Sequence, residues 1–253
     1  NNFIYLFFFI YFIIGILIYK DFGLGIEEHF QRKSGFYWLN YILNFTELSN
    51  LKDLAFTKFE DIKSFTPNIT TIETHKYYGI IFDLPLAFIE TYFKIEGPDI
   101  FYIRHLINFI IFSISGLFFF KIIEFRFKDS FISFAGSFFY LMSPKIFGTS
   151  FFDGKDLFFL SILTISFYFF ANYLKNPSKI NLLYFALFSA FSTSCRIFGV
   201  ILPISFFIIC ISEILNKYTN KCFYRILLYF FFYFIFLFLH WPFLWELNTN
   251  FLN

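Results

Sequence analysis

The chain has 253 residues, of which 58% are hydrophobic and only 15% are charged. This composition excludes an ordinary water-soluble domain, which is nearer about half apolar and about a quarter charged. Such a domain could not hide 50 Phe rings in its core, whereas lipid can solvate them, so we predict an all-α membrane protein. The net charge is +2 and the Lys and Arg residues are dispersed, so we expect no nucleic-acid partner.

The first apolar run, residues 3–19, is predicted to be a membrane span. No small-residue cleavage site follows it, which favours a retained span over a signal peptide. The chain starts with Asn1 instead of Met and stops at Asn253 just past an apolar run. We therefore expect it to be a piece of a longer protein.

A long, mostly polar segment, residues 20–104, follows the first run and opens with an acidic pair. Glu27, Glu28 and His29 lie a few residues beyond the predicted membrane exit. Two adjacent carboxylates at that place favour a general base with a partner carboxylate. A solvated loop start with mixed charges explains the same residues equally well, so both interpretations stay open.

The remainder of this segment is predicted to be helical. Aromatic and aliphatic residues recur at helical spacing, and the run 80–95 is amphipathic, which indicates helices that lie in the membrane interface. His75 and Lys76 precede this run and are followed by Tyr77 and Tyr78. This group favours binding of a sugar ring or a phosphate.

Further apolar runs approach the length of about 20 residues that a helix needs to cross the hydrocarbon. The third and fifth runs of the chain are the shorter ones. With the first run they make about seven predicted spans. The further runs cover residues 105–123, 131–143, 157–174, 180–194, 198–215 and 223–241.

Lys and Arg in the short loops predict the orientation of these spans, because cytosolic loops are enriched in them. Three residues lie in one set of loops: Lys145, Lys155 and Arg196. Eight lie in the alternate loops: Lys121, Arg126, Lys128, Lys175, Lys179, Lys217, Lys221 and Arg225. The N-terminus is therefore predicted to be cytosolic, and the 20–104 segment to face the periplasm or lumen together with Lys145, Lys155 and Arg196.

Two of the predicted extracytoplasmic turns carry charged residues that suit chemistry. Asp156 could simply stabilise the first turn of the following helix, an explanation that fits Asp153 less well. Arg196 lies between two apolar runs, where it could bind a phosphate or a lipid head group. An interfacial Arg whose side chain extends to the membrane surface only to keep its charge in water explains this position equally well.

The layout of residues 27–35, an acidic pair followed by a Gly in the loop after the first span, resembles that of the C-type glycosyltransferases (GT-C). These membrane enzymes include protein O-mannosyltransferases and the lipid A aminoarabinose transferases. Residues 75–79 are similar to a short family motif before the second membrane segment, and residues 143–156 and 196–199 resemble motifs of bacterial members. The chain departs from the family in having Glu27 where Asp is usual.

The resemblance implies an inverting enzyme that moves a sugar from a polyprenyl phosphate to an acceptor hydroxyl at the extracytoplasmic face. It implies Glu27 and Glu28 as the catalytic pair, with Glu27 as general base, and Arg196 and Lys76 as ligands of the donor phosphate. Other residues would orient the acceptor or hold a divalent cation, which some members use and others lack. These are Asp153, Asp156, His29 and His75.

Three alternatives stay open beside this prediction. A transporter or flippase would carry ionisable groups near the centres of its spans and broken helices in matched halves. An O-antigen ligase or polymerase would use Arg and His of a large loop without an acidic pair. An inactive GT-C homologue is the third alternative. The predicted location is the bacterial inner membrane, or the endoplasmic reticulum membrane in a eukaryote.

Overall fold

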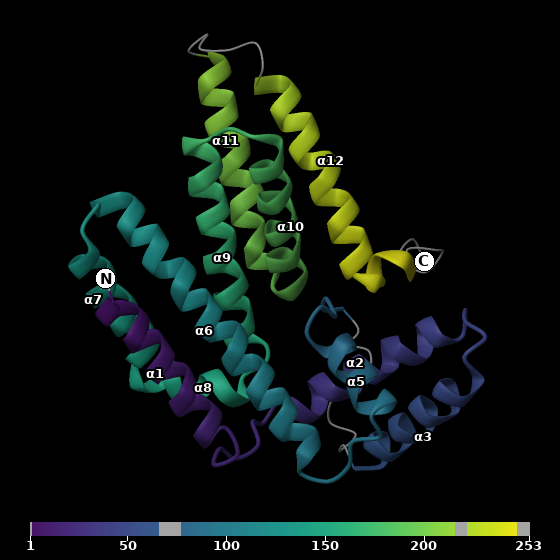
Figure 1. Ribbon diagram of the computed structural model, residues 1–253. Helices are drawn as coiled ribbons and strands as arrows, with labels where there is room; N and C mark the ends of the chain where they lie inside the picture. Colours follow the sequence, from purple (N-terminus) through teal and green to yellow (C-terminus); the bar gives the residue numbers. More distant parts are fainter. Residues whose placement is uncertain (1, 66–76, 216–221, 247–253) are drawn as a thin grey trace.

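A computed structural model describes residues 2–65, 77–215 and 222–246 of the chain. These residues form eleven α-helices and two short 3-10 helices, and no strand occurs among them. The prediction of an all-α fold is confirmed for this part of the chain. A bundle of long helices stands beside a layer of shorter ones, as Figure 1 shows.

Four helices are long and apolar enough to cross a bilayer, which indicates an integral multi-pass membrane protein. Pro203 lies in the first turn of one of them, a place where a helix tolerates proline, and the helix continues through it. The four are α6 (Asp99–Phe127), α9 (Asp156–Lys175), the segment Ile197–Leu215, which joins the 3-10 helix η1 (Ile197–Val200) to α11 (Ile201–Leu215), and α12 (Cys222–His240).

The other predicted spans also coincide with helices, although these are shorter. The first and third runs correspond to α1 (Asn2–Ile18) and α7 (Ser130–Met142), and both are apolar. The fifth run lies within α10 (Lys179–Cys195). Side chains of Asp129 and Ser178 accept hydrogen bonds from the first backbone N–H groups of α7 and α10, and so cap them.

Helix α6 is longer than the predicted span 105–123, at both ends. Arg104, which the prediction left outside the span, is buried because its guanidinium pairs with Asp83. At the other end the helix continues until Lys128, whose φ of 55° is left-handed. The prediction started this helix too late, because the carboxylate that neutralises Arg104 belongs to Asp83, 21 residues earlier in the chain.

Stacked aromatic rings hold α9, α10, α11 and α12 together. The Phe185 ring lies 4.7 Å from Phe170 and 4.8 Å from Tyr229, centroid to centroid. Phe206 of α11 completes the cluster at 4.5 Å from Tyr229. Small buried residues, such as Ala186 and Ser189, let the helices approach closely, as is usual between helices in lipid.

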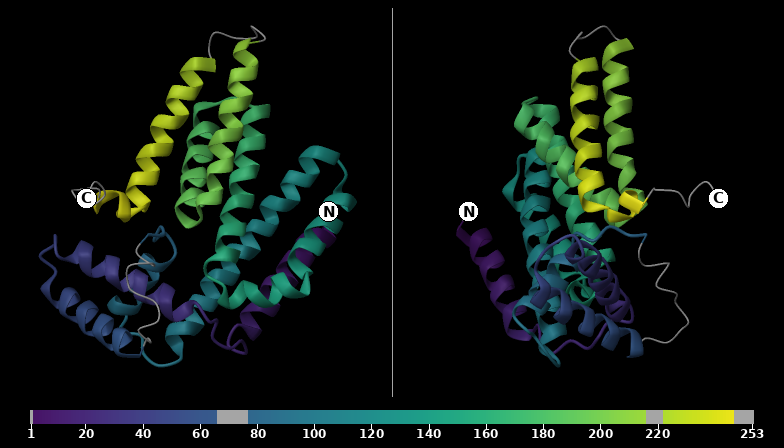
Figure 2. Two further views of the ribbon diagram at one scale, coloured as in Figure 1. Left: turned by 180° about the vertical axis from the view of Figure 1, so that it is seen from behind. Right: turned by 90° about the vertical axis from the view of Figure 1, so that its right-hand side faces the viewer.

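The described residues of the 20–104 segment include three helices that pack on one another at one end of the bundle, ahead of the start of α6 (Figures 1 and 2). We call these helices, α2 (Glu28–Leu43), α3 (Ser49–Phe65) and α5 (Asp83–Tyr92), the surface layer. A Cβ on Gly35 would lie 2.4 Å from the backbone oxygen of Asp83, so only Gly permits this approach of α2 to α5.

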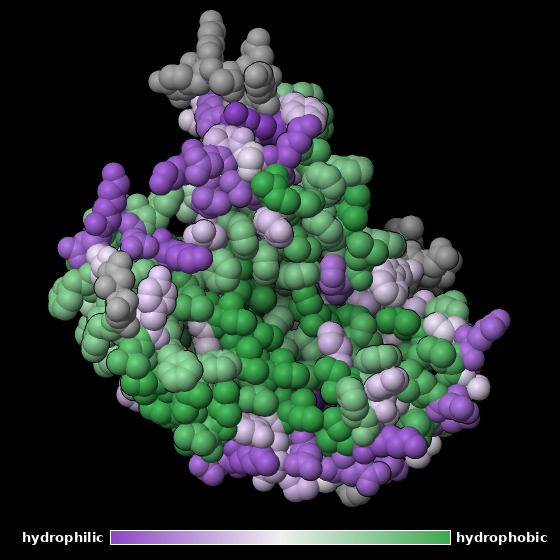
Figure 3. All heavy atoms as spheres, in the orientation of Figure 1, coloured by the Kyte–Doolittle hydropathy of each residue, from purple (hydrophilic) through white to green (hydrophobic). Residues whose placement is uncertain are grey.

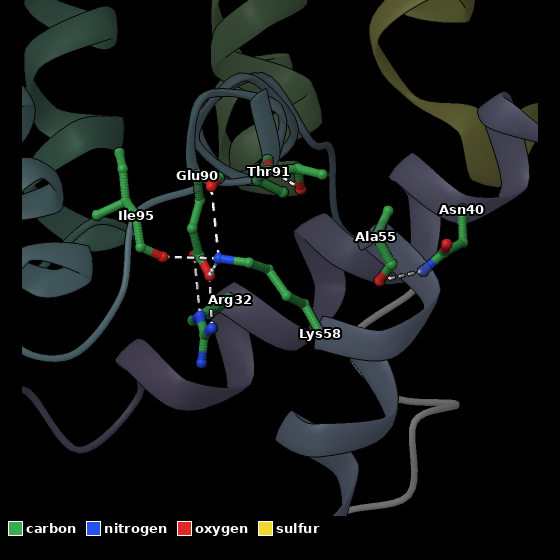
Figure 4. A network of polar contacts seen from close by, with 8 residues as sticks. Arg32, Asn40, Ala55, Lys58, Glu90, Thr91 and Ile95 are labelled. Carbon is green, nitrogen blue, oxygen red and sulfur yellow. Dashed lines mark hydrogen bonds and ion pairs between the residues drawn. The ribbon is translucent and has the colours of Figure 1, made fainter. Parts of the chain in front are cut away.

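A buried ion-pair network joins all three helices of the surface layer (Figure 4). Arg32 of α2 donates to both carboxylate oxygens of Glu90, at 2.9 and 2.5 Å. Lys58 of α3 lies 3.4 Å from the same carboxylate and donates to the Ile95 carbonyl oxygen at 2.6 Å. Glu90, on α5, therefore has a cation from each neighbouring helix.

A hydrophobic belt separates two hydrophilic ends of the molecule in Figure 3. The helices of the seven predicted spans alternate in direction along the chain, so the described Lys and Arg residues of the two sets lie at opposite ends of the bundle. Lys145, Lys155 and Arg196 lie at the end with the surface layer. Lys217 and Lys221, counted in the larger set, lie outside the described residues.

Candidate functional site

A cavity of about 370 Å³ opens where the start of α2 meets the turn between α8 (Pro144–Phe152) and α9. Three carboxylates face it from segments that are far apart in the sequence. The lining residues are Leu24, Gly25, Ile26, Glu27, Gln31, Phe152, Asp153 and Asp156. The chain thus gathers acidic groups at the end of the bundle that carries the surface layer.

Glu27 directly precedes the first residue of α2, and its side chain is 56% exposed. One carboxylate oxygen lies 3.6 Å from the ammonium nitrogen of Lys155. The amino end of α2 adds the partial positive charge of its free N–H groups, which favours a carboxylate at that place. Glu27 is therefore an accessible carboxylate with a fixed cationic neighbour.

Asp153 fixes the turn that leads into α9. Its Oδ1 accepts hydrogen bonds from the backbone N–H groups of Lys155, at 3.2 Å, and Asp156, at 2.8 Å. Burial raises the pKa of Asp153, as do the nearby carboxylates of Asp156 and Glu27, while the two backbone hydrogen bonds oppose the rise. Asp156 is the acid in the first turn of α9, as the sequence allowed, while the hydrogen bonds from the backbone N–H groups at the start of this helix go to the Asp153 carboxylate.

Asp156 instead binds Arg196 with its carboxylate. Arg196 follows the last residue of α10, where the backbone becomes extended, and its side chain is 32% exposed. The guanidinium is thereby held against a residue that lines the cavity. The structure thus brings Glu27, Asp153, Asp156 and Arg196 together.

Lys155 is a site residue that the sequence interpretation did not single out. Its ammonium group lies 3.9 Å from the centroid of the Tyr78 ring, a cation–π contact, and pairs with Glu27. Lys155 also lines a smaller cavity, of about 30 Å³, together with Tyr78 and Asp83. The position of Lys155 between two acids was a signal, but the direction of its side chain is not readable from sequence.

Asp83 and Arg104 form a second buried pair beside this smaller cavity. The Arg104 guanidinium lies 3.1 Å from Asp83 Oδ1, and both side chains are largely buried. Burial raises the pKa of Asp83 to about 6, against the opposing charges of Arg104 and Lys155. In the sequence, Asp83 stands out only as an acid that follows the His75 and Lys76 group, and Arg104 was not predicted to belong to the site.

Glu28 does not line the cavity, unlike its neighbour Glu27. It is only 3% exposed, and its carboxylate accepts a hydrogen bond from the backbone N–H of Gly25 at 2.7 Å. The same carboxylate lies 3.1 Å from Nε2 of His105, which is fully buried on α6. The two members of the acidic pair therefore have different surroundings.

Three further residues were predicted to belong to the site: His29, His75 and Lys76. His29 is exposed, and its ring meets Phe101 edge-on at 5.1 Å. His75 and Lys76 lie outside the described residues.

No metal centre is formed by the described residues, since no three His, Cys, Asp or Glu side chains among them are arranged to hold an ion. The three carboxylates of the cavity are instead engaged with Lys155, with backbone N–H groups and with Arg196.

Comparisons of the chain with models of known protein families, with curated proteins and with solved structures found no match.

Proposed function

We propose that the chain is part of a membrane glycosyltransferase that uses a polyprenyl-phosphate sugar and resembles the C-type family. The observation that carries this proposal is the position of Glu27. It is an accessible carboxylate that lines a cavity at one end of a membrane bundle, beside Lys155. A lipid-borne donor would reach this end from the bilayer, with its phosphate and sugar at the interface.

The proposed orientation rests on the distribution of cations between the two ends of the bundle. Among the described residues of the short loops, six Lys and Arg residues lie at the end away from the cavity and three at the cavity end, which favours a cytosolic location for the former. All seven predicted spans would then cross the membrane, with a cytosolic N-terminus and an extracytoplasmic cavity. The bacterial inner membrane fits this arrangement, as does the endoplasmic reticulum membrane.

In the proposed reaction the acceptor hydroxyl attacks the anomeric carbon of the donor sugar. Its proton passes to a carboxylate oxygen of Glu27, which acts as general base. The bond between the anomeric carbon and the phosphate oxygen breaks, and its electron pair leaves with the lipid phosphate. One displacement inverts the configuration at the anomeric carbon.

Cations near the departing phosphate would stabilise the negative charge that develops there. Lys155 and Arg196 are the described candidates, since both lie against carboxylates of the cavity. Lys76 keeps the role that the family resemblance implies for it. Asp153 and Asp156 would orient the acceptor through hydrogen bonds to its hydroxyl groups.

The test is sugar transfer in membranes that contain the full-length protein, with radiolabelled polyprenyl-phosphate sugars as donors. We expect Glu27→Gln to lower the transfer rate by about 10²–10⁴-fold, the usual contribution of a general base. Asp21→Asn is the matched control, because Asp21 is an exposed acid of the same loop that does not line the cavity. Equal transfer by Glu27→Gln and wild type would remove Glu27 as the base.

A transporter or flippase is the alternative from another class. Such proteins place ionisable groups near the centres of their spans. In the described parts of α6, α9, α11 and α12, the Asp, Glu, Lys and Arg residues lie toward the helix ends, which favours an interfacial enzyme. Movement of the lipid-linked sugar from one leaflet of a vesicle membrane to the other, without sugar transfer to an acceptor, would favour the transporter instead.

A further inference from the structure

Two polar side chains of α6 are buried beneath the cavity. His105 is 0% exposed and Asn108 is 1% exposed, and one helical turn separates them. Residues at this spacing lie on the same face of a helix. Polar groups inside a membrane helix are costly, so each needs partners, and these two residues find them in different loops.

His105 supports the loop that carries Glu27. Its Nδ1 lies 3.3 Å from the backbone oxygen of Tyr19, which can only accept, so Nδ1 carries a hydrogen. Its Nε2 faces the Glu28 carboxylate, which in turn accepts from the backbone N–H of Gly25. The loop between Tyr19 and Glu28 is therefore attached to α6 at both of its ends.

Asn108 supports the other acidic segment in the same way. Its amide nitrogen donates to the backbone oxygens of Ser150, at 2.9 Å, and Asp153, at 3.0 Å. Both hydrogens of the amide are thus used to hold the end of α8 and the turn before α9. The backbone of Asp153 is fixed directly, and its carboxylate lines the cavity.

Aromatic stacking between these two attachments makes the support rigid. The Phe151 ring lies between Phe22, at 4.0 Å, and Phe109, at 4.8 Å, centroid to centroid. Phe22 belongs to the Glu27 loop, Phe151 to α8 and Phe109 to α6. The two acidic segments also touch at Gly25, where a Cβ would lie 2.9 Å from the Phe152 backbone oxygen.

We infer that His105 and Asn108 are positioning residues that set the separation between Glu27 and the two aspartates of the cavity. One rigid helix holds both acidic segments, which are more than 100 residues apart in the chain. The consequence for catalysis rests on the proposed function, whereas the geometric claim does not. Misplacement of a catalytic group by about 1 Å can cost about 100-fold in rate.

The geometric test measures the distance between spin labels on the two acidic segments in the full chain, in nanodiscs. Labels at Ile26→Cys and Lys145→Cys are suitable because both native side chains are exposed. The background carries Cys222→Ser, since Cys195 and Cys210 are buried. We expect a narrow distance distribution that His105→Leu and Asn108→Leu each broaden.

Ser113→Ala is the matched control, because Ser113 is buried on α6 but donates only within its own helix, to the Phe109 carbonyl oxygen. It should leave the distribution narrow. His105→Gln, whose side-chain amide can donate a hydrogen bond to the Glu28 carboxylate, should restore part of the narrow distribution that His105→Leu loses. If both Leu variants keep the wild-type distribution, the inference is overturned.

The catalytic test measures kcat and KM for sugar transfer with the same variants. We expect His105→Leu and Asn108→Leu to lower kcat by about 100-fold with little change in the donor KM. Broadened distances with unchanged kcat would overturn the positioning role. If the wild type transfers no sugar, the proposed function fails, and the label distances alone decide whether α6 supports the two segments.

Discussion

In the surface layer, Glu90 joins three helices through two cations, whereas α9–α12 of the bundle meet through stacked rings. The difference follows from the surroundings of each region. Lipid solvates apolar side chains as well as another helix does, so the bundle depends on close packing. The surface layer has a smaller cluster of buried apolar side chains and adds directional ion pairs. Single polar changes should therefore matter more in the surface layer than in the bundle.

The largest expected effect comes from Glu90→Ala, which leaves Arg32 and Lys58 without their shared carboxylate. Removal of one partner of a buried ion pair costs about 3–5 kcal/mol. Hydrogen exchange should show this loss of stability in the amides of α2, α3 and α5, with α9 and α10 unchanged.

The control for this change is Glu96→Ala, because Glu96 is an exposed acid close to the same network. Its effect should stay within about 0.5 kcal/mol. Equal loss of protection in the bundle and in the surface layer would show that the two regions unfold as one unit.

Asp83→Asn should alter how stability depends on pH. Burial raises the pKa of Asp83 from 3.8 to about 6, so the unfolded chain releases this proton at lower pH than the folded chain does. Raising the pH from about 4 to 6 therefore destabilises the fold, by roughly 3 kcal/mol for a difference of about two pH units.

Thermal melting in detergent across this pH range provides the measurement. The melting temperature of wild type should fall more steeply with rising pH than that of Asp83→Asn. Parallel curves for the two proteins would mean that Asp83 ionises alike in the folded and unfolded chains.

Gly35→Ala tests the close approach of α2 and α5. The added methyl group would meet backbone atoms of Asp83, which cannot rotate away. Overpacking of this kind costs about 1–3 kcal/mol. Gly23→Ala is the control, since a Cβ there meets nothing within 4 Å. Equal melting temperatures for the two variants would contradict the tight crossing.

The smallest effect is expected in the bundle, for Tyr140→Phe. The Tyr140 hydroxyl lies 3.0 Å from that of Ser115 and 3.4 Å from that of Thr164, joining α7 to α6 and α9. Hydrogen bonds between membrane helices average about 0.6 kcal/mol. A loss as large as that from Glu90→Ala, measured by equilibrium unfolding in bicelles, would remove the contrast between the two regions.

The sequence predicted the helices well because run length and amphipathic spacing are local properties. The run 80–95 contains α5, and each apolar run coincides with a helix. The start of α6 was missed, because Arg104 is accommodated by an acid from another helix. An ion pair between residues that are far apart in the sequence cannot be recognised from a short stretch of it.

The same limit explains which parts of the candidate site were predicted. Alternation of the spans was enough to assign Glu27, Asp153, Asp156 and Arg196 to one end. It could not separate Glu27 from Glu28, because the burial of Glu28 depends on His105, 77 residues away. The alternation of the spans also gave no information on the direction of the Lys155 side chain, which pairs with Glu27.

The meeting of the Glu27 loop with the turn before α9, at an extracytoplasmic cavity, is the central claim. A membrane-impermeant bis-maleimide applied to intact cells tests it directly, with Glu27→Cys and Lys155→Cys in a Cys222→Ser background. The native side chains lie 3.6 Å apart, so a cross-linked peptide pair is predicted. The pair Glu27→Cys and Lys175→Cys, at opposite ends of the bundle, should not react together. Absence of the 27–155 link, or its formation only after permeabilisation, would contradict the account.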